Sequence, residues 1–207
     1  MSRTTIVDDA LAGLRLSALR DAATPPAVFR AHARALGALL AREALRDLPA
    51  REVEVQGPLG PATGRVPAAG VVAVPVLRAG LGLLPGVHDL VPDASVGMIG
   101  LERDEETLLA RRYYCNVPPV DGAWVLLLEP MLATGGSAAD ALDQFEFTRA
   151  AAVSVLAVVA TQQAIDHLDT RHPDVDVVTA AVDPGLDGQG FIVPGLGDFG
   201  DRVHATP

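Results

Sequence analysis

Short apolar runs alternate with stretches of helical spacing over most of the chain. Each run is rich in Val, Leu and Ala and is bounded by turn residues, as expected of strands buried on both faces of a sheet. Strands that alternate with helices favour a parallel sheet, whose ligands lie at the carboxyl ends of the strands. The pattern therefore predicts an α/β fold with a central parallel sheet flanked by helices. The predicted strands are 71–76, 95–101, 124–128, 153–160 and 176–181, and the predicted helices are 81–90, 137–148 and 163–168.

The two ends of the chain depart from this alternation. Residues 1–50 are predicted to be an N-terminal helical region, because apolar residues recur at helical spacing from about 24 to 48. Residues 51–70 are predicted to be a β-hairpin arm, of the projecting kind that packs on a partner subunit. The α/β core covers residues 71–182, and residues 183–207 are a tail rich in Gly and Pro. We expect all 207 residues to form a single domain.

Composition narrows the class of protein. The formal net charge is −10, and a nucleic-acid surface needs clustered cations, so we expect no nucleic-acid partner. All 16 basic residues are Arg, which excludes the usual pyridoxal-phosphate chemistry and the lysine of a nucleotide P-loop. An anionic substrate must therefore be held by Arg side chains and backbone N–H groups. Cys115 is the only cysteine, so the chain cannot form an internal disulfide or a Cys-based zinc site.

Neither the N-terminus nor the apolar segments suggest a membrane protein. The first residues lack the apolar core of a signal peptide. The longest apolar segment, about residues 150–160, is shorter than the roughly 20 residues that span a bilayer. We therefore expect no membrane partner and a cytoplasmic location.

The most informative stretch is 125–137, in which an apolar run ends at Glu129 and a short loop leads to Thr-Gly-Gly-Ser at 134–137. Glycines at a helix N-terminus let backbone N–H groups approach a phosphate closely. A carboxylate at the strand end can accept hydrogen bonds from sugar hydroxyls, so the combination points to a phosphorylated sugar. The alternative is a plain turn in which Ser137 caps the helix, with Asp140 completing a capping box.

Other strand ends bring further charges to the same edge of the predicted sheet. Arg78, Arg103 and Asp183 each follow a predicted strand, as Glu129 does. A structural ion pair of Arg78 with Glu129 or Asp183 is the alternative to a ligand-binding role. Arg103 begins a long polar stretch, 103–119, whose length favours an active-site lid, because long structureless loops in compact domains are usually functional.

The tail between residues 190 and 201 is rich in turn residues yet also apolar. Its Phe, Ile, Val and Leu residues need burial, so it is not a disordered tail. Its glycines can turn backbone N–H and C=O groups toward a ligand, and these groups match the amide edge of a flat, uncharged heterocycle. A structural cap on the end of the sheet is the alternative.

Several segments, in order, resemble the uracil phosphoribosyltransferases. The resemblance covers about residues 27–207 and, more weakly, 11–21. The last of the five segments below resembles the uracil-binding segment of that family. The five are VPVLRAGLG (74–82), RDEETL (103–108), PMLATGGS (130–137), HPDV (172–175) and PGLGD (194–198).

The resemblance implies a phosphoribosyltransferase-like fold with a C-terminal base-binding segment, and a role in pyrimidine salvage. The reaction would transfer 5-phosphoribosyl from 5-phospho-α-D-ribose 1-diphosphate (PRPP) to uracil, giving UMP and diphosphate. Mg²⁺ would be the cofactor, held through the donor diphosphate and waters rather than by direct protein ligands. The resemblance also implies a homodimer or larger homo-oligomer, with a purine nucleotide as a candidate effector.

The site residues implied by the resemblance fall into three groups. The catalytic group is Arg78, Arg103 and Asp198. The donor-binding group is Arg78, Arg103, Glu129, Pro130, Met131, Leu132, Ala133, Thr134, Gly135, Gly136, Ser137 and Asp198. The uracil-binding group is Ile192, Gly197, Asp198 and Phe199.

One of two departures from the family pattern, Phe199, keeps other acceptors open. The family usually has Asp where Glu129 stands and Ala where Phe199 stands. Because Phe199 falls in the base-binding segment, a phosphoribosyltransferase for a different heterocyclic base is one alternative. A non-catalytic descendant that binds UMP or another nucleotide is the other, although the retained Arg78 and Arg103 argue against it.

Overall fold

A computed structural model describes residues 2–103 and 110–206 of the chain. Its elements alternate between strand and helix, as the apolar pattern predicts. Two helices that precede the hairpin confirm the N-terminal helical region, although a short strand that the pattern did not predict comes before them. The helices are α1 (Ala10–Arg20), α2 (Pro26–Ala44), α3 (Leu84–Leu90), α4 (Gly136–Leu142), α5 (Gln162–Arg171) and α6 (Phe199–His204), with short 3-10 turns η1 (Ala79–Gly82) and η2 (Phe147–Arg149).

The main sheet has eight strands in the order β1-β12-β10-β8-β4-β6-β7, with β5 also paired to β4. All the pairs are parallel except β6 with β7, which are antiparallel. The prediction of a central parallel sheet is therefore confirmed. The strands are β1 (Thr4–Ile6), β4 (Val71–Leu77), β5 (Ser95–Val96), β6 (Met98–Arg103), β7 (Ala110–Asn116), β8 (Trp124–Leu128), β10 (Ala152–Ala157) and β12 (Asp176–Thr179).

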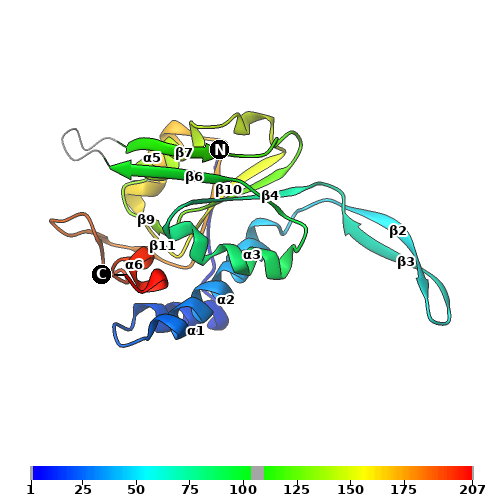
Figure 1. The fold of residues 1–207 in the computed structure, drawn as a ribbon, viewed down its shortest axis with the longest axis horizontal. Helices are drawn as coiled ribbons and strands as arrows, with labels where there is room; N and C mark the ends of the chain where they lie inside the picture. Colours follow the sequence, from blue (N-terminus) through cyan, green and yellow to red (C-terminus); the bar gives the residue numbers. More distant parts are fainter. Residues whose placement is uncertain (1, 104–109, 207) are drawn as a thin grey trace.

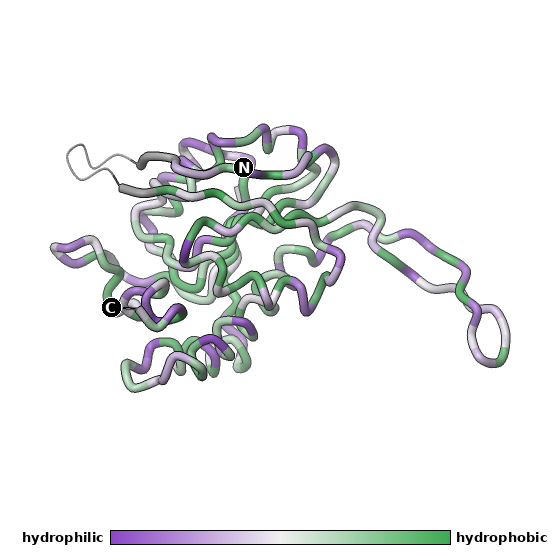
Figure 2. Tube along the Cα trace, in the orientation of Figure 1, coloured by the Kyte–Doolittle hydropathy of each residue, from purple (hydrophilic) through white to green (hydrophobic). Residues whose placement is uncertain are grey.

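Both faces of the sheet are buried, which explains why its strands are continuous apolar runs. Leu126 and Leu128 of β8 join the core that contains residues of α1, α2, α3 and α6. Val125 and Leu127 join the opposite core, with residues of α4 and α5. Successive side chains of a strand point to opposite faces, so a run apolar at every position can serve two helical layers. Figure 1 shows α1 and α2 on one side of the sheet, and Figure 2 shows hydrophobic stretches along its strands.

Several predicted elements differ from the structure. The predicted strand 153–160 divides at Val158, because Val158 N–H and Val159 N–H both donate to the Pro130 carbonyl, at 2.8 and 3.2 Å. The second part, β11 (Val159–Thr161), joins a small parallel sheet with β9 (Met131–Leu132) and β13 (Val182–Asp183). This small sheet lies next to the end of β8, so the division helps to shape the loop after that strand.

The predicted helix 137–148 ends early, at Leu142. Phe145 and Phe147 follow and both pack against the core beneath α4, with their rings edge to face at 6.1 Å. Residues two apart do not share a face of a helix, so burying both rings requires the helix to stop.

The polar stretch 103–119 is not one structureless loop. Its second half forms β7, which pairs with β6 from Met98 opposite Asn116 to Arg103 opposite Ala110. The predicted strand 95–101 is likewise split into β5 and β6 at Gly97. Residues 104–109 lie outside the described part of the chain.

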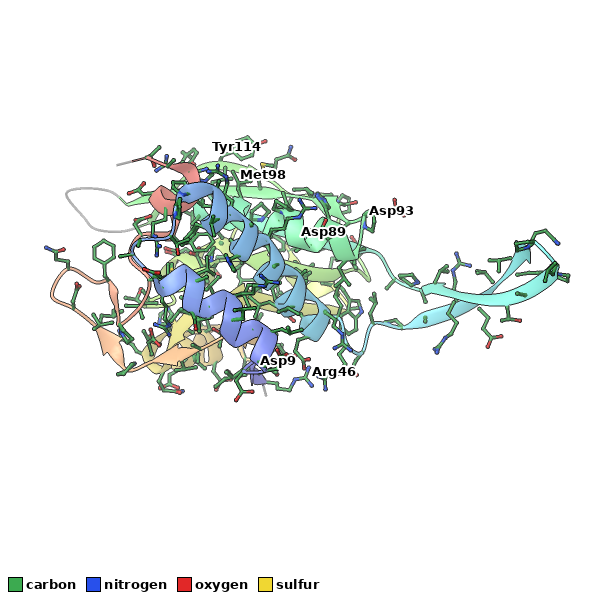
Figure 3. All side chains as sticks on the ribbon, turned by 90° about the horizontal axis from the view of Figure 1, so that it is seen from below. Asp9, Arg46, Asp89, Asp93, Met98 and Tyr114 are labelled. Carbon is green, nitrogen blue, oxygen red and sulfur yellow. The ribbon has the colours of Figure 1, made fainter. Side chains whose placement is uncertain are left out.

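The hairpin arm is confirmed as β2 (Ala50–Gly57) and β3 (Gly60–Pro67), which pair along their whole length. It projects well away from the body in two perpendicular views (Figures 1 and 3). The tail contains β14 (Gly185–Leu186) and β15 (Ile192–Val193) before α6. None of the helices in the described residues is long and apolar enough to cross a membrane.

Candidate active site

The loop after β8 is held in shape by backbone geometry. Glu129 N–H donates to the Leu156 carbonyl at 3.1 Å, which continues the sheet one residue beyond β8. Gly135 stands at the N-cap of α4 with φ of +80°, and a Cβ there would lie 2.8 Å from the Ala164 carbonyl oxygen. Only glycine meets both conditions without strain. The alternative of a Ser137 capping box is therefore wrong: Ser137 lies inside α4, and Gly135 occupies the cap.

Thr161 supports this loop from the neighbouring small sheet. Its Oγ1 donates to the Ala133 carbonyl at 2.6 Å and accepts a hydrogen bond from Ala164 N–H at 3.1 Å. One hydroxyl thus caps α5 and fixes the loop residue that precedes Thr134. Sequence reasoning missed this role, although a Thr three residues before Ala164 at the start of a helix is a recognisable cap signal.

Glu129 lies at the centre of the site. It keeps some exposure toward the cavity but is surrounded by protein, and burial raises the pKa of its carboxyl group to about 8. Among the described residues, no hydrogen-bond donor or cation pairs with this carboxylate. A carboxyl group that is buried without a partner is free to accept hydrogen bonds from a ligand, and a shifted pKa of this kind is typical of functional sites.

Two adjoining cavities meet at Glu129. The first, about 180 Å³, follows the loop, and we call it the loop cavity. The second, about 220 Å³, lies along the C-terminal segment at residues 190–200, and we call it the segment cavity. Both are lined by Glu129, Met131, Ala133 and Gly190. The loop cavity is also lined by Leu132, Thr134, Gly135, Ser137, Ala138 and Gln189, and the segment cavity by Ala79, Phe191, Ile192, Gly197, Asp198, Phe199 and Gly200.

The two cavities bring together most of the predicted site residues. Arg78, Pro130 and Gly136 do not line either cavity, although Pro130 and Gly136 belong to the loop. Gln189, Gly190 and Phe191 are lining residues that sequence reasoning did not assign. The glycine-rich tail between β14 and β15 was the signal for them, since such a turn can close over a cavity.

Arg78 lies at the end of β4, and its carboxylate partner is Asp201. Its guanidinium is 3.3 Å from a carboxylate oxygen of Asp201 in α6, and its side chain is 60% exposed. The alternative of an ion pair with Glu129 or Asp183 is therefore wrong. The turn after Arg78 packs closely on β8, since a Cβ at Gly80 would lie 2.3 Å from the Leu128 carbonyl oxygen. This contact holds the Arg78 turn against the strand that carries Glu129.

Arg103 is the last residue of β6, which pairs with β4 beside Leu77. Its side chain and residues 104–109 lie outside what the structure describes. The roles of Arg103 in the site and of the stretch 103–119 as a lid therefore stay predictions.

Phe199 lines the segment cavity, but its ring belongs to the core. The side chain is fully buried, and its ring meets the ring of Phe29 edge to face at 5.2 Å. It also lies against Gly82, where a Cβ would come within 2.7 Å of the ring. The large side chain at this position is therefore accommodated by α2 and η1. Asp198, just before it, caps α6 by accepting a hydrogen bond from Asp201 N–H at 2.8 Å.

Asp183 follows a predicted strand, as Arg78 and Glu129 do, but its carboxylate is already paired within the protein. It forms two hydrogen bonds with Arg20, the last residue of α1, at 2.8 and 2.7 Å. Sequence reasoning missed Arg20 because the pairing spans 163 residues, and no local pattern reports a contact of that range.

The chain shares its fold with solved phosphoribosyltransferases. A solved hypoxanthine phosphoribosyltransferase of Trypanosoma cruzi, in complex with its product IMP, aligns over 76% of each chain with a TM-score of 0.51. At 13% identity this likeness shows the fold alone. A solved protein structure from Aquifex aeolicus is nearer, with a TM-score of 0.92 and 33% identity over 98% of each chain.

The particular family follows from the sequence relatives. The family model described as "Uracil phosphoribosyltransferase" matches residues 6–206. The uracil phosphoribosyltransferase of Thermus thermophilus is 44% identical over 206 residues, which is 99% of each chain. That of Halalkalibacterium halodurans is 40% identical over 208 residues, covering both chains completely. The chain belongs to the uracil phosphoribosyltransferase family.

Proposed function

We propose that this protein transfers the 5-phosphoribosyl group from PRPP to uracil, giving UMP and diphosphate. The observation that carries the proposal is the match over residues 6–206 to this family, together with relatives that align over their whole length. The order of the site supports it as well. The loop with its backbone N–H groups would bind the phosphate of a nucleotide. The central carboxyl group would bind its ribose, and the glycine-rich segment would bind its base.

The residues have separate tasks in this proposal. Backbone N–H groups and hydroxyls of 134–137 hold the 5-phosphate, and Glu129 accepts hydrogen bonds from the ribose hydroxyls. Arg78 and Arg103 hold the diphosphate, and the chain has no lysine that could do so. As the bond from C1 to diphosphate breaks, negative charge grows on the leaving group and the ribose becomes oxocarbenium-like. Cations in fixed positions stabilise that charge separation most where it is greatest.

The base is bound in the segment cavity in this proposal. Ile192, Gly197, Asp198 and Phe199 all line that cavity, and their backbone groups present the hydrogen bonds that an amide edge requires. The burial of the Phe199 ring against Phe29 supports uracil as the acceptor. With the ring in the core, the replacement of a smaller residue leaves backbone recognition intact.

Mg²⁺ fits the carboxyl groups of this site. Glu129 and Asp198 both line the segment cavity, and carboxylate oxygens bind Mg²⁺ or accept hydrogen bonds from its waters. When bound, Mg²⁺ would neutralise charge on the departing diphosphate. The role of Asp198 would be to orient the metal-bound waters, while Glu129 binds the ribose hydroxyls.

A second copy of the chain is the partner that we propose for the hairpin arm. Val55 on β2 is half exposed, and Leu59 at the hairpin turn is fully exposed. An isolated two-stranded ribbon is only marginally stable in water, so packing on another subunit would stabilise it. Light scattering should show a homo-oligomer that dissociates more readily when Leu59 is replaced by Asp. A monomer at all concentrations would contradict this proposal.

A cytoplasmic location and regulation by a purine nucleotide complete the proposed role in pyrimidine salvage. Cell fractionation tests the first. Assays with and without added GTP test the second, and an unchanged rate would remove the effector from the proposal.

The deciding experiment is a panel of bases incubated with PRPP and Mg²⁺, with diphosphate release and nucleotide formation followed together. We expect uracil to be the preferred acceptor and UMP the product. Preference for another heterocycle, or binding of UMP without turnover, would overturn the proposed function.

A further inference from the structure

Arg20 closes a hydrogen-bonded network around one peptide of the C-terminal segment. Its guanidinium donates two hydrogen bonds to Asp183, at 2.8 and 2.7 Å, and a third to the Gly195 carbonyl at 2.8 Å. Asp183 in turn accepts a hydrogen bond from Gly195 N–H at 2.8 Å. Both polar groups of Gly195 are therefore held by this one ion pair.

The network is partly shielded from water. The side chain of Asp183 is 6% exposed and that of Arg20 is 25% exposed. Burial acts to raise the pKa of Asp183, but the hydrogen bonds from Arg20 and from Gly195 N–H outweigh it and lower that pKa below the ordinary value. Hydrogen bonds between charged groups in such surroundings are stronger and more directional than exposed ones.

A second arginine, Arg202 in α6, holds Leu196, the residue after Gly195. Arg202 of α6 donates to the Leu196 carbonyl at 2.7 Å and to the Asp21 carbonyl at 2.6 Å. It also donates to the Leu19 carbonyl, and its guanidinium lies 4.4 Å from the centre of the Phe29 ring. The end of α1 and residues 195–196 are thus joined by two guanidinium groups.

These contacts lie next to the segment cavity but outside it. Gly197 and Asp198 follow directly and line the cavity, and Ile192 lines it three residues before Gly195. Among the described residues that line either cavity, none belongs to α1. Any effect of Arg20 on a ligand must therefore pass through the position of the segment.

We propose that Arg20 is a positioning residue for the base: through Asp183 and Gly195 it fixes residues 192–198 in the conformation that binds the acceptor. The proposal rests on the proposed function for the identity of the base, but the positioning itself is a property of the fold. Loss of Arg20 would leave the buried Asp183 without its cation and free one side of Gly195. The segment would then sample positions that bind the base poorly, while the loop at 129–137 would be unaffected.

The test uses Arg20→Gln and the conservative Arg20→Lys, with Arg34→Gln as a matched control. Arg34 also makes a two-bond ion pair, with Asp89 at 2.6 Å for both bonds, but it joins α2 to α3. Hydrogen exchange of peptides covering 192–198 is measured on the free full-length protein, where Gly195 N–H reports directly on Asp183. The KM values for uracil and for PRPP, kcat and the melting temperature are measured on the same samples.

We expect faster exchange in 192–198 for Arg20→Gln and a rise in the KM for uracil of about tenfold or more, the loss typical of a charged hydrogen bond. The KM for PRPP should change by less than about twofold, Arg20→Lys should recover part of the loss because it keeps the charge, and Arg34→Gln should resemble the wild type. Unchanged exchange in 192–198, or equal rises in both KM values, would overturn the proposal. If Arg20→Gln folds poorly, Arg20→Lys alone decides by the same two readouts. If Arg20→Gln exchanges faster in 192–198 but the wild type does not use uracil, the positioning role is supported and the proposed function is overturned.

Discussion

The loop at 129–137 and the segment at 192–199 form the two ends of one site, yet they are held in different ways. The loop takes its shape from a contiguous strand, turn and helix, with Gly135 at the bend and Thr161 as its nearby support. The segment is fixed by Arg20 from near the N-terminus and by Arg202 from near the C-terminus. The first end is therefore shaped by its own strand, turn and helix and by the neighbouring residues 156–164, whereas contacts across the whole chain determine the second.

Replacing Phe199 by Ala tests how far the segment depends on the core. We expect a loss of about 3–5 kcal/mol in the free energy of unfolding, because a fully buried ring is removed. The preference for uracil should persist, since backbone groups rather than the ring are proposed to contact the base. Denaturant unfolding and kcat/KM for uracil against other heterocycles check both expectations.

Phe29→Ala is the matched control, because it removes the partner ring from the same contact without altering the segment. If the wild type does not use uracil but the Phe199→Ala variant does, the ring excludes the base.

Replacing Gly135 by Ala tests the local end of the site. The positive φ and the close Ala164 carbonyl should cost about 3 kcal/mol, enough to lower kcat/KM for PRPP by roughly 100-fold. The KM for uracil should change little, because the segment is held separately. Gly13→Ala in α1 is the control, since a Cβ there meets nothing within 4 Å. Equal losses for both substrates would mean that the two ends are not independent.

Arg78→Ala should weaken binding of PRPP far more than binding of UMP, because the proposed partner of Arg78 is the leaving diphosphate. A charged contact of this kind contributes about 2–3 kcal/mol. Calorimetry gives both Kd values. Asp201→Asn serves as the comparison, as it removes the carboxylate beside Arg78 without removing the cation. Equal weakening of PRPP and UMP would contradict the assignment.

Glu129→Gln should change how stability depends on pH. Burial raises the pKa of Glu129 to about 8 from an ordinary 4.5, so between these values the folded protein keeps a proton that the unfolded chain has released. The stability of the wild type therefore falls as pH rises through this window. Gln cannot ionise, so the melting temperature of the variant relative to wild type should be higher at about pH 8.5 than at about pH 5. The same difference at both pH values would mean that Glu129 titrates normally.

The comparison also explains which parts of the molecule could be predicted from the sequence. The strands that end at Leu77 and Leu128 lie where their apolar runs predict, because burial on both faces leaves a continuous signal. The glycines of the loop likewise mark a bend that the structure confirms. In both cases the information lies within about ten neighbouring residues.

The errors arise where distant residues decide. Asp183 appeared available to Arg78 because both follow strands, but Arg20 takes it. Whether the Phe199 ring enters the base site stayed open, because its burial depends on Phe29 and Gly82, which lie far away in the chain. The early end of α4 depends on Phe145 and Phe147 reaching the core below it. No periodicity in the sequence reports such contacts.

The pairing of the two chain ends has a consequence for how the protein is made. The contact between Arg202 and Leu19 spans 183 residues, and contacts of such range form late because the intervening chain must be closed first. During synthesis α1 emerges early and must wait for the last helix before its end is tied to residues 195–196. A nascent or truncated chain that lacks α6 would carry a complete loop at 129–137 and an unfinished segment. The synthesis of α6 therefore sets the earliest point at which Arg202 can fix the segment that we propose to bind the acceptor.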